Sequence, residues 1–230
     1  MAIGGLQKNS FIDYPGKICC VIFLTGCNFE CPYCHNPELA KDCLPKSVGA
    51  GAVYDFLEAR KGLLDGVVIS GGEPTLFSGL FSLCEKIKSM GYPVKLDTNG
   101  SRPRILKRLI DEKLIDYIAM DIKTDPFNYT PLIQNNCKTE HILSSIHVIM
   151  QSGIPYEFRT TCVKPLVNEN VIERIAGIVN GSTLYVLQQF QFTGVHHPEY
   201  FRDRGLLFAD DELALLKSIA EPWVENCTIR

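Results

Sequence analysis

The sequence has little excess charge and no long apolar run. Its formal net charge is -3 over 230 residues, so the bulk composition gives no reason to expect nucleic acid or an anionic membrane as a partner. No stretch approaches the roughly 20 consecutive apolar residues that a membrane-spanning helix needs, and no charged segment near the start leads into an apolar one. We therefore expect a cytoplasmic protein that binds neither nucleic acid nor membrane.

Internal repeats, low-complexity tracts and Pro/Gly/Ser-rich linkers are also absent. The hydrophobic fraction of 46% and the charged fraction of 21% are ordinary for a soluble globular protein and argue against disorder. A chain of 230 residues is near the upper limit of what one hydrophobic core serves. These observations predict one domain that spans residues 1–230.

Short apolar runs alternate with amphipathic segments along the whole chain. The near-continuous apolar runs predict strands buried on both faces, at 18–24, 67–70, 94–97, 117–122, 156–163 and 183–190. Between them, apolar residues at three- and four-residue intervals predict helices, with faces formed by Val53, Phe56 and Leu57, by Leu80, Leu83, Cys84 and Ile87, and by Ile105, Leu109 and Ile110. This βα alternation predicts an α/β fold, either an open barrel or a doubly wound sheet, with ligands at the carboxyl ends of the strands.

Three of the ten cysteines, Cys27, Cys31 and Cys34, lie in one loop directly after the first predicted strand. Thiolates that converge from one loop bind soft metal centres, either an iron–sulfur cluster or zinc. A structural zinc site needs four ligands, yet no second pair of closely spaced cysteines follows, and His35 is awkwardly close to Cys34. Three ligands on a four-iron cluster would leave one iron open for chemistry.

The spacing of these cysteines, with the aromatic Tyr33 before the last of them, resembles the radical S-adenosylmethionine superfamily. The turn Ser70–Pro74 is similar to the superfamily's GGE motif, which implies that Gly72 and Glu73 contact the amino group of the methionine moiety and that Gly71 also belongs to the cofactor site. The resemblance implies a partial (β/α)6 TIM-like barrel, a [4Fe–4S] cluster on the three cysteines, and S-adenosylmethionine as cofactor. The implied reaction is reductive cleavage of that cofactor to a 5′-deoxyadenosyl radical.

The opening segment 5–17 and the continuation 34–39 are similar to activating enzymes of glycyl radical enzymes, most of all to those of anaerobic ribonucleoside-triphosphate reductase. This implies hydrogen abstraction from a glycine of a large partner enzyme, with flavodoxin, ferredoxin or a similar protein as electron donor. Longer activating enzymes carry a ferredoxin-like insert with eight cysteines after the cluster loop. Here only Cys43 lies between Cys34 and Ser70, so we expect no such insert.

Two further strand ends resemble segments of pyruvate formate-lyase activating enzyme. They contain Asp97, Thr98 and Asn99 in one case, and Asp121 and Lys123 in the other, and the resemblance implies that these residues surround the carboxylate end of the cofactor. The carboxylates of Asp97 and Asp121 would repel each other and the carboxylate of the cofactor unless a cation lay between them. Asp97, Thr98 and Asp121 are therefore candidates for a monovalent-cation site, and Lys123 for pairing with the cofactor carboxylate.

Arg159 lies inside an apolar predicted strand, where an unpaired guanidinium would be costly. We expect it to meet a carboxylate, either that of Glu73 or that of the ligand. In the last predicted strand, Gln189 falls where the family places contacts to adenine or ribose. The other thiols in predicted strands and helices are expected to be small buried hydrophobic groups: Cys19, Cys20, Cys84 and Cys162.

Two alternatives remain open at this point. A radical enzyme that acts on a small molecule, such as a 7-carboxy-7-deazaguanine synthase, has a similar cluster and barrel, although this chain lacks the usual glutamine-glycine-glutamate entry signature. A non-catalytic zinc or redox-binding module would use the same cysteines. The sequence assigns no role to Cys43 or to the pair His196 and His197.

Overall fold

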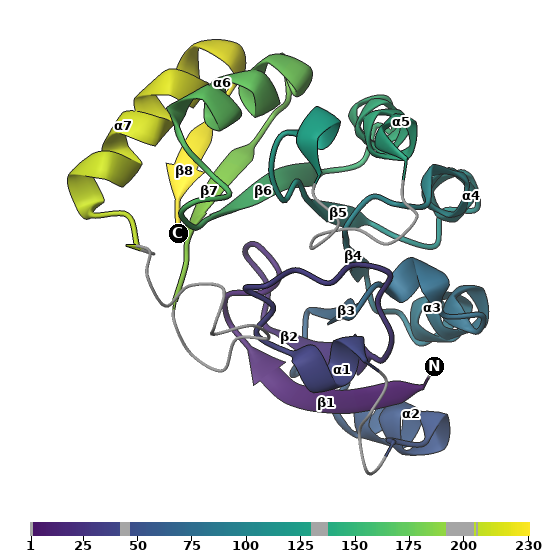
Figure 1. Cartoon of the computed structure of the whole chain (residues 1–230). Helices are drawn as coiled ribbons and strands as arrows, with labels where there is room; N and C mark the ends of the chain where they lie inside the picture. The colour runs from purple at the N-terminus through teal and green to yellow at the C-terminus, as the bar shows by residue number, and fades with distance from the viewer. Residues whose placement is uncertain (1, 42–46, 130–137, 192–204, 206) are drawn as a thin grey trace. The chain divides into compact units, whose positions relative to one another are not determined.

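The computed structural model describes residues 2–41, 47–129, 138–191, 205 and 207–230. The chain forms two compact units, in each of which strands and helices alternate (Figure 1). The first unit contains residues 1–28, 36–98 and 104–118, and the second contains residues 29–35, 99–103 and 119–230. The loop of three cysteines therefore passes from the first unit into the second.

In the first unit, four paired strands follow one another in chain order. The first pair is antiparallel, and the next two pairs are parallel, as expected where helices connect the strands. The strands are β1 (Ile3–Ser10), β2 (Cys19–Leu24), β3 (Gly66–Gly71) and β4 (Val94–Thr98).

The helices of this unit bury the apolar faces that their sequence periodicity predicts. The buried residues include Val53 and Leu57 on one helix, and Leu83 and Ile87 on the next. On the third helix the most buried residues are Leu106 and Leu109 rather than Ile105 and Ile110, so the predicted face is rotated by about one residue. The helices are α1 (Pro37–Ala40), α2 (Ala50–Ala59), the 3-10 turn η1 (Pro74–Leu76), α3 (Leu80–Ser89) and α4 (Pro103–Asp111).

The second unit contains three parallel strands in chain order, with helices between them. The strands are β6 (Tyr156–Cys162), β7 (Tyr185–Gln189) and β8 (Cys227–Ile229), and β5 (Tyr117–Asp121) begins in the first unit and ends in the second. The helices are the 3-10 turn η2 (Pro126–Asn128), α5 (Thr139–Met150), α6 (Glu169–Ile178), α7 (Asp210–Ala220) and the 3-10 turn η4 (Glu221–Trp223).

All six predicted strands are present, and the structure adds two that the sequence did not reveal. Strand β1 contains adjacent glycines and several polar residues, and its middle positions are half-buried or exposed. Such a segment lacks both the continuous apolar run and the alternation from which strands are predicted. Strand β8 has only three residues, of which Cys227 alone is buried. Both strands are formed because a neighbouring strand offers them backbone partners.

The described cysteines inside strands and helices are buried, as predicted. Cys19, Cys20, Cys84 and Cys162 have no exposed surface. Burial raises the pKa of the Cys20, Cys84 and Cys162 thiols to about 12, so these side chains are neutral hydrophobic groups at physiological pH. Cys43 lies outside the described residues, as do His196 and His197.

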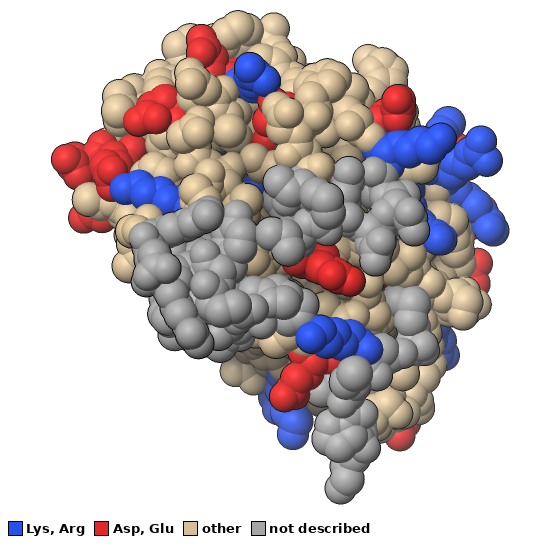
Figure 2. All heavy atoms as spheres, in the orientation of Figure 1, with Lys and Arg blue, Asp and Glu red and all other residues tan. Residues whose placement is uncertain are grey.

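None of the helices in the described ranges is long and apolar enough to cross a membrane. Figure 2 shows basic and acidic side chains on the same face of the molecule. The cytoplasmic location and the absence of nucleic-acid binding stay predictions.

The core of the first unit gives a stability prediction. Ile22 lies in the middle of β2 with no exposed surface, so we expect Ile22→Ala to lower the free energy of unfolding by about 2–5 kcal/mol through lost burial and a residual cavity. Ile12→Ala is the matched control, since the Ile12 side chain is 83% exposed. Urea denaturation measures both variants, and an equal loss of stability in the two would contradict this description of the core.

Candidate functional site

The loop that carries the three cysteines leaves β2 at Leu24 and starts in the first unit. The backbone N–H groups of Gly26 and Cys27 donate hydrogen bonds to the carbonyl oxygens of Leu39 and Ala40 in α1, at 2.7 and 2.9 Å. Because these are backbone contacts, they fix the course of the loop at Cys27 whatever the neighbouring side chains do.

The turn after β3 holds the same loop from another direction. The N–H of Gly72 donates to the carbonyl of Leu24 at 2.9 Å, and the N–H of Glu73 donates to the carbonyl of Gly26 at 2.8 Å. Leu24 is also the register partner of Gly71 in the parallel pair of β2 and β3. The GGE turn and the first part of the cysteine loop therefore form one backbone assembly.

Both glycines of the turn are required by this close approach. Gly71 has a φ of +117°, a conformation that residues with a Cβ avoid. A Cβ on Gly71 would overlap the backbone of Leu24, and a Cβ on Gly72 would overlap the carbonyl group of Gly26. The sequence predicted these glycines as cofactor-contacting residues, and the structure shows a second reason for them, namely contact between two segments of the backbone.

Glu73 is buried, and its carboxylate receives several donors. Its Oε1 accepts hydrogen bonds from the N–H and the hydroxyl of Thr75 and, at 2.8 Å, from the hydroxyl of Thr98. These bonds compensate the burial of a charge and fix the orientation of the side chain at the N-terminus of η1.

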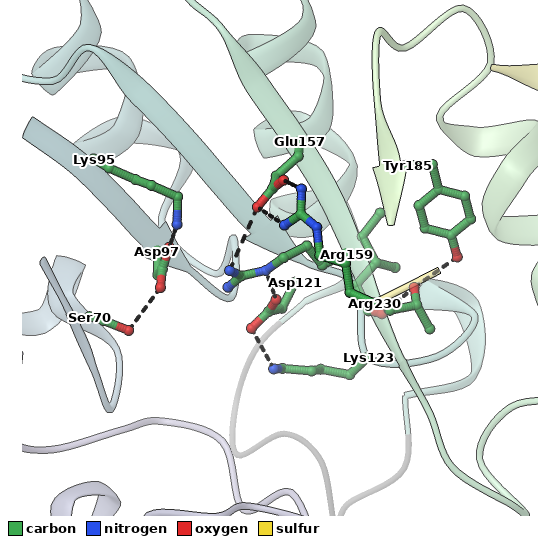
Figure 3. A network of polar contacts seen from close by, with 11 residues as sticks. Ser70, Lys95, Asp97, Asp121, Lys123, Glu157, Arg159, Tyr185 and Arg230 are labelled. Atoms are coloured by element: carbon green, nitrogen blue, oxygen red, sulfur yellow. Dashed lines mark hydrogen bonds and ion pairs between the residues drawn. The ribbon is translucent and has the colours of Figure 1, made fainter. Parts of the chain in front are cut away.

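Asp97 and Thr98 lie on opposite faces of β4, because successive side chains of a strand alternate. The Thr98 hydroxyl contacts Glu73, whereas the Asp97 carboxylate forms an ion pair between Oδ1 and the Nζ of Lys95. Its Oδ2 accepts a hydrogen bond from the hydroxyl of Ser70 at 3.0 Å (Figure 3). The two residues predicted to share a cation site thus direct their side chains to different partners.

In the second unit, Cys31 and Cys34 are joined by a turn. The N–H of Cys34 donates to the carbonyl of Cys31 at 3.0 Å, which brings the two residues to one side of the loop. Burial raises the pKa of the Cys31 thiol to about 11, against the opposing effect of Lys123. A metal that binds Cys31 must therefore displace a proton from a neutral thiol.

Tyr33 lies between these two cysteines with 3% of its surface exposed. Its ring packs edge-on against Phe190, with 6.3 Å between centroids, and the Nζ of Lys123 lies 6.0 Å from the ring centroid. The hydroxyl oxygen is buried without a hydrogen-bond partner among the described residues. A buried donor of this kind is uncommon and costly, and it suits a residue whose partner is a bound ligand.

Asp121 at the end of β5 is held by two cations (Figure 3). The Nε of Arg159 lies 2.7 Å from Oδ1, and the Nζ of Lys123 lies 2.9 Å from Oδ2. Burial opposes the charged carboxylate, but Arg159 and Lys123 outweigh it and hold the pKa of Asp121 well below its usual range. Asp121 in turn helps to hold the pKa of Lys123 well above its ordinary value, again against the effect of burial.

The ion pairs continue from Arg159 to the C-terminal strand region. Glu157 is 1% exposed, and both oxygens of its carboxylate meet the guanidinium of Arg230, at 3.2 and 2.8 Å. A guanidinium nitrogen of Arg159 lies 3.8 Å from the same carboxylate. Arg230, Glu157, Arg159, Asp121 and Lys123 thus alternate in charge in one continuous row within the second unit.

Arg159 was predicted to meet the carboxylate of Glu73 or of the ligand. It does meet carboxylates, but those that the structure shows are Asp121 and Glu157. Asn99 accepts the N–H of Ser101 at 3.0 Å, so it also stabilises a turn. Gln189 is exposed, with its amide 3.4 Å from the carbonyl of Phe208. His35, which sequence reasoning considered as a fourth ligand, has its Nε2 2.7 Å from the carbonyl of Gln191.

Three charged residues of the site were missed by sequence reasoning: Lys95, Glu157 and Arg230. The sequence pattern could have identified two of them. Lys95 precedes Asp97 by two residues, and Glu157 precedes Arg159 by two, so each shares a strand face with a residue that had been singled out. Arg230 gave no such signal, because its partner lies 73 positions away in the sequence.

The chemistry of the donor set fits an iron–sulfur cluster, whose usual ligands are thiolates. Cys27, Cys31 and Cys34 carry no disulfide, the turn of Gly71 and Gly72 leaves no room for a side chain, and Tyr33 presents an unpartnered hydroxyl. No group of three His, Cys, Asp or Glu side chains in the described ranges is placed to hold a single metal ion.

The predicted monovalent-cation site already has partners within the protein. Both carboxylate oxygens of Asp97 and both of Asp121 already have donors within the protein, and Thr98 gives its hydroxyl to Glu73. A cation at Asp97 would therefore have to share the carboxylate oxygens with the Lys95 ammonium and the Ser70 hydroxyl, or displace them.

Comparison with known proteins agrees with this geometry. The sequence profile of the radical SAM superfamily matches residues 21–177. A "Putative glycyl-radical enzyme activating enzyme" of Methanocaldococcus jannaschii is 36% identical to this chain, over 99% of this chain and 95% of the relative. The chain belongs to the radical SAM superfamily, among its glycyl-radical enzyme activating enzymes. A pyruvate formate-lyase-activating enzyme of Streptococcus mutans is 31% identical over 89% of this chain and 81% of its own length.

The fold of this radical SAM enzyme is also that of solved relatives. The Streptococcus suis protein SuiB, bound to S-adenosylmethionine, matches 91% of this chain and 51% of its own chain with a TM-score of 0.66 at 13% identity. The predicted fold class, an α/β partial (β/α)6 TIM-like barrel of the radical SAM type, is thereby confirmed.

The packing of the GGE turn gives a direct prediction for this radical SAM protein. We expect Gly72→Ala to lower the free energy of unfolding by about 1–3 kcal/mol, because the new methyl group must displace the Gly26 carbonyl and overpack the turn. Gly51→Ala is the control, since nothing lies within 4 Å of a Cβ at this position in α2. Chemical denaturation would refute the close approach if the two variants unfolded alike.

The buried carboxylate of Glu157 gives a second prediction. Replacing Arg230 with Gln removes the guanidinium that meets both oxygens of that carboxylate, so we expect a loss of about 1–3 kcal/mol in unfolding free energy. Adding Glu157→Gln should recover part of this loss, because a neutral amide no longer needs a guanidinium partner. Arg108→Gln, in an exposed pair with Glu112, should change stability by less than about 0.5 kcal/mol. A double variant no more stable than Arg230→Gln alone would count against the pairing.

Proposed function

We propose that this protein is an activase that binds a [4Fe–4S] cluster and S-adenosylmethionine and abstracts a hydrogen atom from a glycine of a partner glycyl radical enzyme. The partner that we propose is anaerobic ribonucleoside-triphosphate reductase. When bound, the cluster and S-adenosylmethionine supply the reductive cleavage that yields a 5′-deoxyadenosyl radical. The residues of this chain would bind and orient both groups and prevent competing reactions.

The observation that carries this proposal is the similarity to activating enzymes along nearly the whole chain. It is supported by the position of the three cysteines, which lie within the segment that matches the superfamily profile. If only the fold were similar, any kind of radical reaction would be compatible with it. Sequence similarity to an activating enzyme over the whole length also supports a glycyl radical enzyme as the class of partner.

In the proposed site the thiolates of Cys27, Cys31 and Cys34 bind the cluster and leave one iron for the cofactor. Thiolate is the ligand that such clusters require. Cys27 is positioned by backbone hydrogen bonds that the loop donates to carbonyl oxygens of α1, and Gly71 and Gly72 bring the GGE turn against the same stretch of loop. We assign the binding of the methionine moiety to Gly71, Gly72 and Glu73.

The cationic side chains of the second unit are assigned to the carboxylate of the cofactor. Lys123, Arg159 and Arg230 share two carboxylates, those of Asp121 and Glu157, so this row carries an excess of positive charge for an anionic ligand. Tyr33 offers its unpartnered hydroxyl. Asn99 and Gln189 complete the proposed set as polar contacts to the remainder of the nucleoside.

We further propose that residues 1–230 form a single radical SAM domain without a ferredoxin-like insert. Between Cys34 and Ser70 the sequence has one cysteine, Cys43, too few for an additional cluster. The single electron for each cleavage must then come from a separate protein. Flavodoxin, ferredoxin or a similar small carrier is the proposed donor.

The deciding experiment is anaerobic reconstitution with iron and sulfide, followed by reductant and S-adenosylmethionine. We expect 5′-deoxyadenosine and methionine to form in equal amounts. Adding anaerobic ribonucleoside-triphosphate reductase should then give the doublet of a glycine-centred radical in electron paramagnetic resonance. The matched control is the same reductase with its radical-bearing glycine replaced by alanine, which should give no doublet.

Other outcomes would favour the competing functions. Normal cleavage without a radical on any candidate partner would contradict the activase proposal and favour a small-molecule substrate of the 7-carboxy-7-deazaguanine synthase kind. An intact colourless protein that holds stoichiometric zinc would favour a non-catalytic metal-binding module.

The cysteines give a prediction that does not depend on the partner. We expect Cys27→Ser, Cys31→Ser and Cys34→Ser each to abolish the visible absorbance of the reconstituted cluster, since a serine hydroxyl is a poor ligand for iron that prefers thiolate. Cys84→Ser is the control because this thiol is buried on α3, so it should lose stability and retain the cluster. Equal absorbance in all four variants would rule out the assigned ligands.

A further inference from the structure

Lys95 occupies a position where a charge is unexpected. Parallel strands place Val21, Val68 and Lys95 side by side in one row across β2, β3 and β4. The first two are buried apolar residues, and Lys95 itself is only 1% exposed. A buried ammonium is costly unless an anion and hydrogen-bond acceptors compensate it.

The surroundings of Lys95 are aromatic and apolar on one side. Its Nζ lies 5.9 Å from the centroid of the Tyr117 ring, close enough for a cation–π attraction. Tyr117 packs against Tyr14 with 5.7 Å between ring centroids. Both rings belong to a buried cluster that also contains Cys19, Val21 and Val68.

On its other side the ammonium meets one carboxylate. Lys95 and Asp97 are two residues apart on β4 and therefore share a face of the strand, and the Nζ of Lys95 forms an ion pair with Oδ1 of Asp97 (Figure 3). Ser70, the hydroxyl donor to Oδ2, lies on the neighbouring strand β3. The Asp97 carboxylate is thus supplied with a positive charge and a neutral donor from within the first unit.

We propose that the Lys95 ammonium is the built-in cation of this site and that it makes the Asp97 region independent of Na⁺ and K⁺. Lys95 is then a positioning residue that holds the Asp97 carboxylate in one orientation beside Ser70, the residue directly before the two glycines of the GGE turn. The link to cofactor binding rests on the proposed function, whereas the ion pair itself does not.

Removing the ammonium should expose this role. The Lys95→Met variant largely keeps the aliphatic part of the side chain but removes the ammonium group beside Asp97. A small monovalent cation could then take the place of that ammonium. We expect the midpoint of thermal unfolding of this variant to fall by roughly 10 °C in tetramethylammonium chloride, and to rise saturably when K⁺ or Na⁺ replaces the organic cation at equal ionic strength. The natural protein should show the same midpoint in all three salts.

Two variants test whether the effect belongs to this pair. Lys95→Met with Asp97→Asn should lose the cation response and regain stability, because no carboxylate is left without a partner. Lys107→Met removes a lysine from an exposed pair with Asp111 and should show no cation response. A Lys95→Met protein insensitive to K⁺ and Na⁺, or a double variant that responds as the single one does, would overturn the proposal.

A measurement on the unaltered protein covers the case in which Lys95→Met does not fold. Thallium(I) has the charge and nearly the size of K⁺, and its binding is followed by thallium magnetic resonance. We expect no saturable site for thallium(I) in the anaerobically purified protein, and a saturable site that K⁺ displaces would contradict the built-in cation. These readouts need no cofactor cleavage, so failure of the activase proposal and failure of this one are distinguishable.

Discussion

The contact on which the site depends is the one between the backbone of the GGE turn and the backbone at the start of the cysteine loop. Glycine at positions 71 and 72 removes the side chains that would separate the two segments, and hydrogen bonds from Gly72 and Glu73 join them to Leu24 and Gly26. The position of Cys27 follows from this contact, because Cys27 is the next residue in the loop. Backbone contacts of this kind connect the parallel strands directly to the first of the three cysteines that we propose as cluster ligands.

A second constraint concerns charge: three acidic groups of the site each have a cationic partner inside their own unit. Asp97 has Lys95, Asp121 has Lys123 and Arg159, and Glu157 has Arg230. In the row of the second unit, three cations share two carboxylates, so positive charge remains for an anionic ligand. In the first unit, by contrast, the Lys95 ammonium is matched to the Asp97 carboxylate, and we propose that this pair takes the place of a bound metal cation.

The sequence predicted the α/β class and six of the strands because a parallel strand covered on both faces needs a continuous apolar run. It did not predict β1, whose glycines and polar residues form a strand only beside β2. The cysteines and glycines of the site were predicted from motifs, but the reason for Gly72 is a contact across the sheet that no local pattern contains. The ion pairs were predicted least well. Arg230 and Glu157 are brought together by strand register, and register depends on the whole fold.

The proposed chemistry requires that three thiolates of one loop bind an iron–sulfur cluster. Chemical analysis of iron and acid-labile sulfide in protein purified without air tests this binding. We expect iron and sulfide in equal amounts, in a brown protein that bleaches when oxygen is admitted. Folded protein that contains neither iron nor sulfide, or that holds zinc in their place, would contradict it.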